Sequence, residues 1–330
     1  MLGAGRFAAA CHSAVTDPWL AALPPVGSVD QVADSTPVRS SISAAGRCGR
    51  STVSPVSIPT VPLNDGHAIP AIGFGTFPHA GDDSRTTAIT ALDAGYRLLD
   101  TALRYENEKG VGRAVREYDL PREEILVCTK LAGRHHGYDE TIKGCHESLA
   151  NLGLDYVDIY LIHWPLPRLD KYVDSWKAMV HLRDEGLVRS IGVSNFTEEH
   201  LRRIIDATGV VPVMNQVELH PYFPQAALRA VHAELGVVTE SWSPMGRGEL
   251  LSEPTVTAIA EAHGVTPAQA ILRWHVQLGA VPIPKSADPA RQRANLDVFG
   301  FTLSDAEVAA LTGLERGRIW GQDPDTHEEF

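Results

Sequence analysis

Three ionisable residues each close a short apolar run of the sequence. Asp100, Lys130 and His163 end three successive runs that are rich in Leu, Val and Ile, and Tyr105 follows Asp100 by five residues. A free phenol has a pKa of about 10 and is a poor acid near neutral pH, but a neighbouring ammonium group lowers that pKa. Tyr105 would then act as a general acid beside Lys130. Asp100 would hold Lys130 charged, and His163 would donate a hydrogen bond to a substrate carbonyl.

This chemistry requires the fold to bring the ends of the runs together. Eight short runs rich in Val, Ile and Leu alternate with helix-like segments, as buried parallel strands do: residues 71–74, 96–100, 125–130, 157–163, 190–193, 213–216, 237–241 and 280–284. The alternation favours an α/β fold of the (β/α)8 type, with an open doubly wound sheet as the alternative. In a barrel the C-terminal ends of the strands meet at one mouth, so Asp100, Lys130 and His163 would converge there.

The segments between these runs carry helix-start signals. Ser304 and Glu307 have the spacing of a capping box, Thr266 precedes Pro267, and Thr197 precedes a helical apolar stripe. Ser and Thr side chains satisfy the free N–H groups of a first helical turn, and Pro is tolerated at its first position. We therefore expect helices to begin directly after positions 197, 266 and 304.

The chain divides near residue 58. Residues 1–58 are rich in Ala, Ser, Gly and Pro and show little apolar periodicity, so we predict a disordered N-terminal extension. A secretory signal or a transit peptide is an alternative, but the apolar patch at 7–11 is short and the stretch contains acidic residues. The turn signal at 64–66 predicts a β-hairpin at the start of a barrel domain that spans 59–330.

Composition excludes several classes of protein. The chain has 29 Lys and Arg against 41 Asp and Glu, a formal net charge of −12, which disfavours non-specific binding to nucleic acid or to an anionic membrane. No apolar run approaches the ~18–20 residues of a membrane helix. The cysteines at 11, 48, 128 and 145 form no C-x-x-C pair and show no zinc spacing, so we expect no metal site and a cytoplasmic location.

Several short motifs carry a resemblance to a known family. In chain order they are Gly73-Phe74-Gly75-Thr76, Leu99-Asp100-Thr101-Ala102, Tyr105-Glu106-Asn107-Glu108, Thr129-Lys130, Ile162-His163-Trp164-Pro165, Gly192-Val193-Ser194-Asn195-Phe196, Asn215-Gln216-Val217-Glu218 and Ile283-Pro284-Lys285-Ser286. This series resembles the aldo-keto reductase family, and within it the bacterial 2,5-diketo-gluconate reductase-like group. The resemblance covers the chain from about residue 61 onward. It implies a TIM barrel, NADPH-dependent carbonyl reduction and a monomer.

Carried over residue by residue, the resemblance implies a catalytic tetrad of Asp100, Tyr105, Lys130 and His163. The residues that it implies for NADPH are Gly75, Thr76, Asp100, Ser194, Asn195, Gln216, Trp242, Ser243, Lys285, Ser286, Arg291 and Asn295, and those for the substrate are Phe77, Tyr105, His163 and Trp164. Trp242 would stack on the nicotinamide. Lys285 and Arg291 would bind the adenosine 2′-phosphate, which favours NADPH over NADH. The family often has Glu before the matching Asn, where this chain has Ala294.

Other patterns have structural interpretations. The pair His135-His136 could suggest a metal site, but no matching carboxylate or thiol spacing supports one, and we interpret it as part of a solvated loop. Gly110 and Gly112 lack the third small residue of a dinucleotide motif, so we interpret them as packing positions. Cys128, Trp176 and Trp274 are expected in the core.

Three functions remain open at this point. The first is an NADPH-dependent reductase of a small aldehyde, an α-dicarbonyl or a keto-sugar. The second is a cofactor-sensing regulatory or binding protein on the same barrel, because a fold does not fix a function. The third is a barrel hydrolase that uses Asp100 with Glu218 as a carboxylate pair.

Overall fold

The computed structural model describes residues 58–79 and 81–329, and within them eight parallel strands form one sheet in the order β10-β9-β8-β7-β6-β5-β4-β3. The strands are β3 (Phe74–Gly75), β4 (Leu98–Asp100), β5 (Leu126–Leu131), β6 (Val157–Ile162), β7 (Val188–Ser194), β8 (Met214–Glu218), β9 (Val238–Trp242) and β10 (Ala280–Pro282). Backbone hydrogen bonds close the sheet, from Gly73 N to Pro282 O at 3.0 Å and from Gly75 N to Pro284 O at 3.1 Å. This closure confirms the predicted (β/α)8 barrel, and the open doubly wound sheet is wrong.

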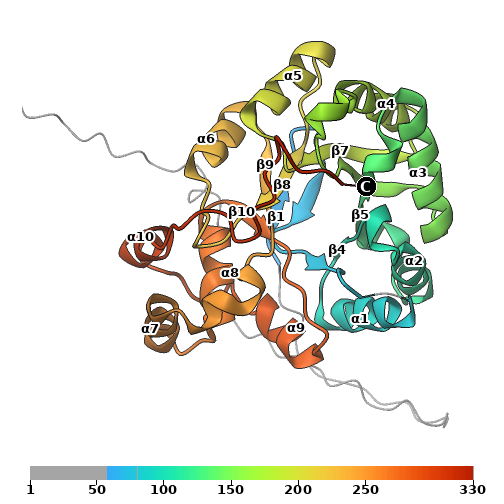
Figure 1. The fold of residues 1–330 in the computed structure, drawn as a ribbon. Helices are drawn as coiled ribbons and strands as arrows, with labels where there is room; N and C mark the ends of the chain where they lie inside the picture. Colours follow the sequence, from blue (N-terminus) through green and yellow to red (C-terminus); the bar gives the residue numbers. More distant parts are fainter. Residues whose placement is uncertain (1–57, 80, 330) are drawn as a thin grey trace, which may run out of the picture. The chain divides into compact units, whose positions relative to one another are not determined.

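Helices surround the strands (Figure 1). In the described residues they are α1 (Gly81–Ala94), α2 (Glu108–Glu117), α3 (Tyr138–Leu152), α4 (Tyr172–Asp184), α5 (Glu198–Thr208), α6 (Ala226–Leu235), α7 (Pro254–His263), α8 (Pro267–Gln277), α9 (Pro289–Leu296) and α10 (Asp305–Thr312). Thr197, Thr266 and Ser304 cap α5, α8 and α10, and each side chain accepts a backbone N–H from three positions further on. The helix starts predicted from these residues are confirmed.

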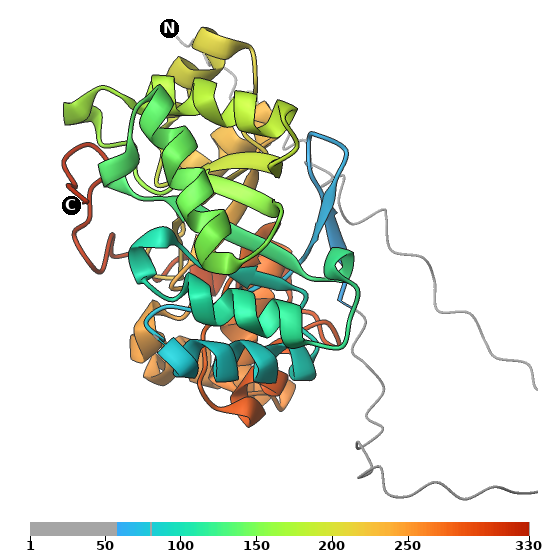
Figure 2. The ribbon, with the colours of Figure 1, turned by 90° about the vertical axis from the view of Figure 1, so that its right-hand side faces the viewer.

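The predicted hairpin covers one end of the barrel. It consists of β1 (Thr60–Pro62) and β2 (Ala68–Pro70), which pair antiparallel around the turn at 64–66. Ile69 packs in one apolar cluster with the barrel residues Leu98, Ile159 and Val281. Figure 2 shows the hairpin (blue) on the opposite side of the barrel from segment 318–329 (dark red). The site must therefore lie at the other end, where the strands finish.

Two apolar clusters pack helices against the barrel, and each contains a tryptophan, Trp176 in the larger cluster and Trp274 in the smaller one. Trp176 and Trp274 are fully buried, as expected, and each indole N–H donates to a threonine hydroxyl, of Thr208 and Thr312 respectively. Buried indoles with a satisfied N–H fix the helices that carry them without leaving an unpaired donor.

The predicted extension 1–58 falls, apart from Ile58, outside the described residues. Within the part of the chain that is described, no helix combines the length and the apolar character that a bilayer crossing needs.

Two glycines of α2 let neighbouring helices approach closely. A Cβ at Gly110 would overlap Ser84 Oγ in α1, and a Cβ at Gly112 would overlap the backbone oxygen of Leu152 at the end of α3. Gly110 and Gly112 are therefore packing positions, as the sequence predicted. The close approach of α1 and of α3 to α2 depends on them.

We predict that Gly112→Ala lowers the free energy of unfolding by about 1–3 kcal/mol, because overpacked sites force the backbone to shift. Urea denaturation followed by circular dichroism measures this loss. Gly300→Ala is the matched control, since its Cβ would meet no atom closer than Asp297 Oδ1 at 4.0 Å. Equal stability of the two variants would show that the contact with α3 is unimportant.

Candidate active site

Lys130 and Asp100 form a buried ion pair at the ends of β5 and β4. Lys130 Nζ lies 2.7 Å from Asp100 Oδ1 and 2.8 Å from Oδ2, and it donates to the backbone oxygen of Thr101 at 2.8 Å. Lys130 is 0% exposed and Asp100 is 2% exposed. Burial disfavours the ammonium, but the Asp100 carboxylate raises the pKa of Lys130 above its ordinary value. Lys130 is therefore a fixed cation whose three N–H groups are all engaged.

Tyr105 lies beside this pair, in the short 3-10 helix Leu103–Tyr105 that follows β4. Lys130 Nζ is 5.1 Å from the centroid of the Tyr105 ring, and the Phe77 and His163 rings are 5.0 Å and 5.7 Å from it. Burial raises the pKa of Tyr105 to about 12, against a smaller lowering by Lys130. The expectation of a phenol pKa below its free value is thus wrong in this structure. Burial destabilises the phenolate more strongly than the charge of Lys130 stabilises it.

His163 follows β6 directly and faces the same mouth. It is 9% exposed, and its Nδ1 lies 2.6 Å from Glu329 Oε1. Trp164 follows it, and its ring centroid is 4.1 Å from that of His327. The structure thus places His163 and Trp164 in contact with segment 318–329, which crosses the ends of the strands in Figure 1.

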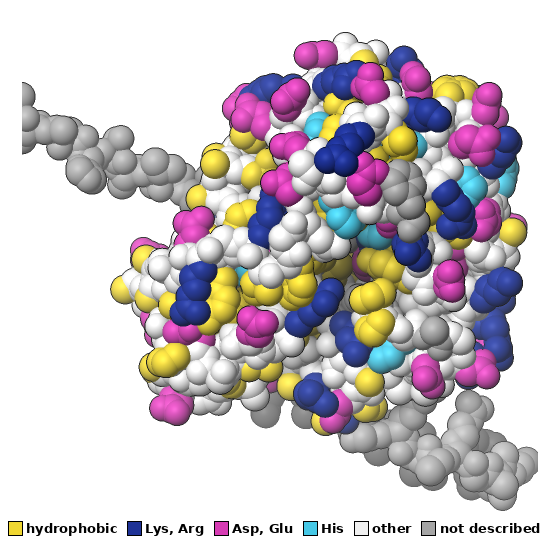
Figure 3. Space-filling model, viewed as in Figure 1, with side chains coloured by type: hydrophobic (Ala, Val, Ile, Leu, Met, Phe, Trp, Pro, Cys, Tyr) yellow, Lys and Arg dark blue, Asp and Glu magenta, His cyan; other side chains and the backbone are white. Residues whose placement is uncertain are grey.

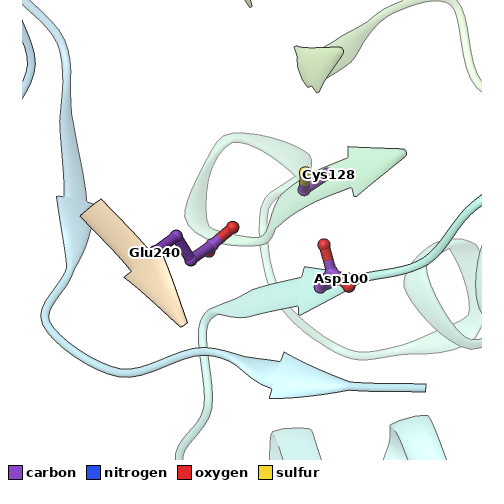
Figure 4. A group of neighbouring side chains, drawn as sticks. All are labelled: Asp100, Cys128 and Glu240. Atoms are coloured by element: carbon purple, nitrogen blue, oxygen red, sulfur yellow. The ribbon is translucent and has the colours of Figure 1, made fainter. Parts of the chain in front are cut away.

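A second acidic residue, Glu240, lies next to the ion pair. The side chains of Asp100, Cys128 and Glu240 point toward one another from three strands (Figure 4), with their ligand-type atoms within 4.8 Å. Burial and the charge of Asp100 raise the pKa of Glu240 to about 8, and the same two causes raise the pKa of the Cys128 thiol well above its usual value. A protonated carboxyl and a thiol are poor metal ligands, so this set favours hydrogen bonding over metal binding.

Gln216 joins these two carboxyl groups. Its Nε2 donates to Asp100 Oδ2 at 2.8 Å and to Glu240 Oε2 at 2.6 Å. One amide group therefore satisfies oxygen atoms on two different strands. Among the described residues no side chain or backbone N–H donates to the side-chain oxygen of Gln216, so this atom could accept from an amide ligand.

Side chains predicted to contact a nicotinamide lie next to Gln216 at the same mouth. Ser194 Oγ donates to Gln216 O at 2.9 Å, and Asn195 Nδ2 donates to His163 O at 3.0 Å. Trp242 Nε1 donates to Asn195 Oδ1 at 2.8 Å, and Ser243 follows with a φ of 50°. Side-chain hydrogen bonds therefore connect the C-terminal ends of β6, β7, β8 and β9, in addition to the backbone hydrogen bonds of the sheet.

Gly75 and Thr76 complete this ring at the end of β3. Thr76 Oγ1 donates to Asp100 O at 2.9 Å, and it accepts from Asn107 Nδ2 at 3.1 Å. Gly75 also pairs with Asp100 in the sheet, so both residues help to position Asp100.

The residues predicted for the 2′-phosphate (Lys285, Ser286 and Arg291) and for the adenine (Asn295) follow β10. Lys285 and Arg291 are exposed, whereas Ser286 and Asn295 are 8% and 5% exposed. Lys285 makes no ion pair with any residue in the described ranges, and Arg291 Nε has only a 3.7 Å contact with Asp288. Figure 3 shows this face of the molecule hollowed near its centre, with Lys and Arg side chains at the rim of the hollow. Two cations with little internal pairing beside a buried hydroxyl and amide fit an anionic nucleotide.

Comparison with known proteins decides the family. A sequence profile of the aldo/keto reductase family matches residues 71–316. The chain belongs to the aldo/keto reductase family. It is 57% identical to the 2,5-diketo-D-gluconic acid reductase B of Corynebacterium sp. (strain SHS752001) over 275 residues, which cover 83% of this chain and 99% of that relative. It is therefore an oxidoreductase of this family.

Solved structures agree with this membership. An aldo/keto reductase from Brucella melitensis matches with a TM-score of 0.77 and 47% identity, covering 78% of this chain and 98% of the other. A mutant of Gox0644 in complex with NADPH matches with a TM-score of 0.79 and 46% identity, covering 82% and 99%. These values confirm that the barrel of this reductase is the barrel of the family.

The sequence did not reveal every group at this mouth. Glu329 was missed, because a carboxylate in a polar segment gives no signal that it will fold back over a distant strand. His136 does lie in a loop, after the 3-10 helix Gly133–His135, but the expectation that it is solvated is wrong: the residue is 3% exposed, and burial lowers its pKa to about 4. Glu218 Oε1 accepts from Ile319 N at 2.8 Å and lies 3.1 Å from His220 Nε2, and membership in a reductase family sets the hydrolase alternative aside.

We predict that Glu240 makes the stability of this reductase decrease as pH rises. Its pKa of about 8 in the folded chain exceeds the ordinary value of 4.5, so the folded state holds a proton that the unfolded state releases between these values. Glu240→Gln keeps an acceptor for Gln216 and should abolish this part of the decrease between pH 5 and 8.

Urea denaturation at several pH values tests this, because groups remote from Glu240 contribute equally to both proteins. Glu261→Gln, an exposed change on α7, is the control. If wild type and Glu240→Gln lose stability with the same slope, Glu240 is ionised in the folded state.

Proposed function

We propose that this aldo/keto reductase reduces the carbonyl group of small aldehydes, α-dicarbonyls or keto-sugars with NADPH, and that Tyr105 protonates the carbonyl oxygen. The observation that carries the proposal is the cluster of Tyr105, His163 and the buried Lys130–Asp100 pair at one mouth. NADPH, when bound, supplies the hydride.

Tyr105 is suited to hold a proton and to give it up only during reduction. With a pKa of about 12 it stays protonated at neutral pH. As the proton moves to the carbonyl oxygen, a negative charge develops on the phenol, 5.1 Å from Lys130 measured at the ring centroid. Because Lys130 is held in place by Asp100, it needs no rearrangement to stabilise that charge. His163 would orient the carbonyl by donating a hydrogen bond.

The residues along the mouth fit NADPH. Lys285 and Arg291 would hold the 2′-phosphate, since both are exposed and neither has a short ion pair within the described chain. Asn295 would contact the adenine, and Trp242 offers a partly exposed ring for the nicotinamide. The relative that binds NADPH in its solved structure supports this cofactor.

The substrate class rests on the residues around Tyr105. Phe77, which is 50% exposed, packs on the Tyr105 ring, and Trp164 stands next to His163. These rings would border a small carbonyl compound, and a relative named as a 2,5-diketo-D-gluconic acid reductase supports an oxidised sugar among the substrates. A cytoplasmic monomer remains our prediction for the protein's state.

We predict that Tyr105→Phe lowers kcat for methylglyoxal reduction by at least about 100-fold while leaving NADPH affinity within about threefold, because only the proton donor is removed. Loss of NADPH absorbance and fluorescence titration measure the two quantities. Tyr138→Phe, at an exposed tyrosine of α3, is the control. Retained turnover in Tyr105→Phe would refute the acid assignment. Tight NADPH binding by a wild type without turnover would favour the regulatory alternative.

We predict that Lys285→Ala with Arg291→Ala weakens NADPH binding by about 100-fold, because two charge-assisted contacts contribute about 3 kcal/mol together. NADH binding, which involves no 2′-phosphate, should change less than tenfold. Lys177→Ala with Arg183→Ala on α4 removes the same charge elsewhere and serves as the control. Equal losses for both cofactors would contradict the 2′-phosphate assignment.

A further inference from the structure

Segment 318–329 brings a carboxylate into the candidate active site. Glu329 Oε1 lies 2.6 Å from His163 Nδ1, and Glu329 Oε2 accepts from the backbone N–H of Gly133 at 3.2 Å. Glu329 is 8% exposed, although the residues just before it in the segment are more open. Both of its carboxylate oxygens are thus occupied, one by the candidate catalytic histidine.

Gly133 of the barrel leaves space for the backbone of this residue. A Cβ at position 133 would overlap the backbone oxygen of Glu329, so only glycine allows the segment to approach this closely. Further contacts hold the segment on either side, with His327 against the Trp164 ring and Glu328 ion-paired to Arg168 at 3.1 Å. The position of Glu329 is therefore built by the fold around it.

The carboxylate of Glu329 carries its charge at neutral pH. Burial would raise its pKa, but His163 and the Gly133 N–H more than offset this and hold the pKa below its ordinary value. The nearest cation of the tetrad, Lys130, is already paired with Asp100. A negative charge thus stands one imidazole ring away from the place where His163 would orient a carbonyl oxygen.

We propose that Glu329 is a specificity-determining residue that discriminates against substrates with an anionic group adjacent to the reacting carbonyl, in favour of their uncharged counterparts. The inference rests on the proposed function, because it takes His163 as the residue that orients the carbonyl. Glu329 is in contact with Nδ1, so the carbonyl oxygen meets Nε2, and a carboxylate on the next carbon lies close to Glu329 among largely buried side chains. Like charges in such a site repel strongly.

The discrimination does not depend on the protonation of His163. If His163 is neutral, Glu329 repels the anionic substrate directly. If His163 is protonated, Glu329 cancels a positive charge that would otherwise attract the anion. In both cases Glu329→Gln removes one negative charge and keeps the shape of the side chain. A carboxylate several bonds from the reacting carbon, as in a keto-sugar acid, can point out of the mouth and escapes the penalty.

The test compares pyruvate with methyl pyruvate, which share the reacting ketone and differ in one charge. We expect the ratio of kcat/KM for methyl pyruvate to that for pyruvate to fall at least tenfold in Glu329→Gln relative to wild type. Intrinsic reactivity cancels in this comparison of ratios. Where pyruvate turnover is too slow to measure, the inhibition constant of pyruvate against methyl pyruvate reduction gives the same comparison, and it should fall in the variant.

Two further variants separate charge from structure. Glu328→Gln removes the charge of the neighbouring residue, which forms an ion pair with Arg168 and does not contact His163. This variant should leave the ratio within twofold of wild type. Gly133→Ala displaces Glu329 without changing any charge, and should shift the ratio in the same direction as Glu329→Gln.

An unchanged ratio in Glu329→Gln, or an equal shift in Glu328→Gln, would overturn the inference while leaving the reductase assignment intact. Failure of the wild type to reduce methyl pyruvate, methylglyoxal or any other uncharged carbonyl would instead overturn the proposed function, and the inference with it.

Discussion

The buried pair of Lys130 and Asp100 is the constraint on which the rest of the site depends. A charge that is removed from water is costly, and a buried pair that loses one partner destabilises a protein by about 3–5 kcal/mol. Lys130 meets this requirement with both oxygens of Asp100 and with Thr101 O, so every N–H group of the ammonium is engaged. β4 and β5 must therefore stay in register at their C-terminal ends, where Asp100 pairs in the ladder with Cys128.

The charge of Asp100 in turn affects the protonation of the neighbouring Glu240. Glu240 lies close enough to Asp100 that a second carboxylate would be strongly repelled, and its proton is retained because the site is buried. Gln216 bridges the two groups from β8. The interior at the mouth thus carries polar side chains from β4, β5, β8 and β9, and among the described residues of this group Lys130 and Asp100 form the ion pair.

The same burial that fixes Lys130 governs Tyr105. Removing water raises the phenol pKa to about 12, which keeps the proton in place until an acceptor arrives. A fixed cation beside a protonated phenol is preorganised for the negative charge that forms during proton transfer. Folding has already oriented this cation, so the reaction requires no further rearrangement of it. Segment 318–329 adds a second charge of opposite sign beside His163, and it makes the mouth electrically asymmetric.

The sequence by itself determined the local elements and the residues that close them. Eight apolar runs, the capping residues Thr197, Thr266 and Ser304, and the ionisable strand ends were all readable, because periodicity and capping are short-range properties of the chain. Only the tertiary structure decided the net pKa of Tyr105, the burial of His136 and the seat of Glu329. All three features depend on which distant segments pack over a group and exclude water from it. The residue pattern within one segment cannot indicate those contacts. Glu329 and His163 are 166 positions apart in the chain, and only the closed barrel brings them within 2.6 Å.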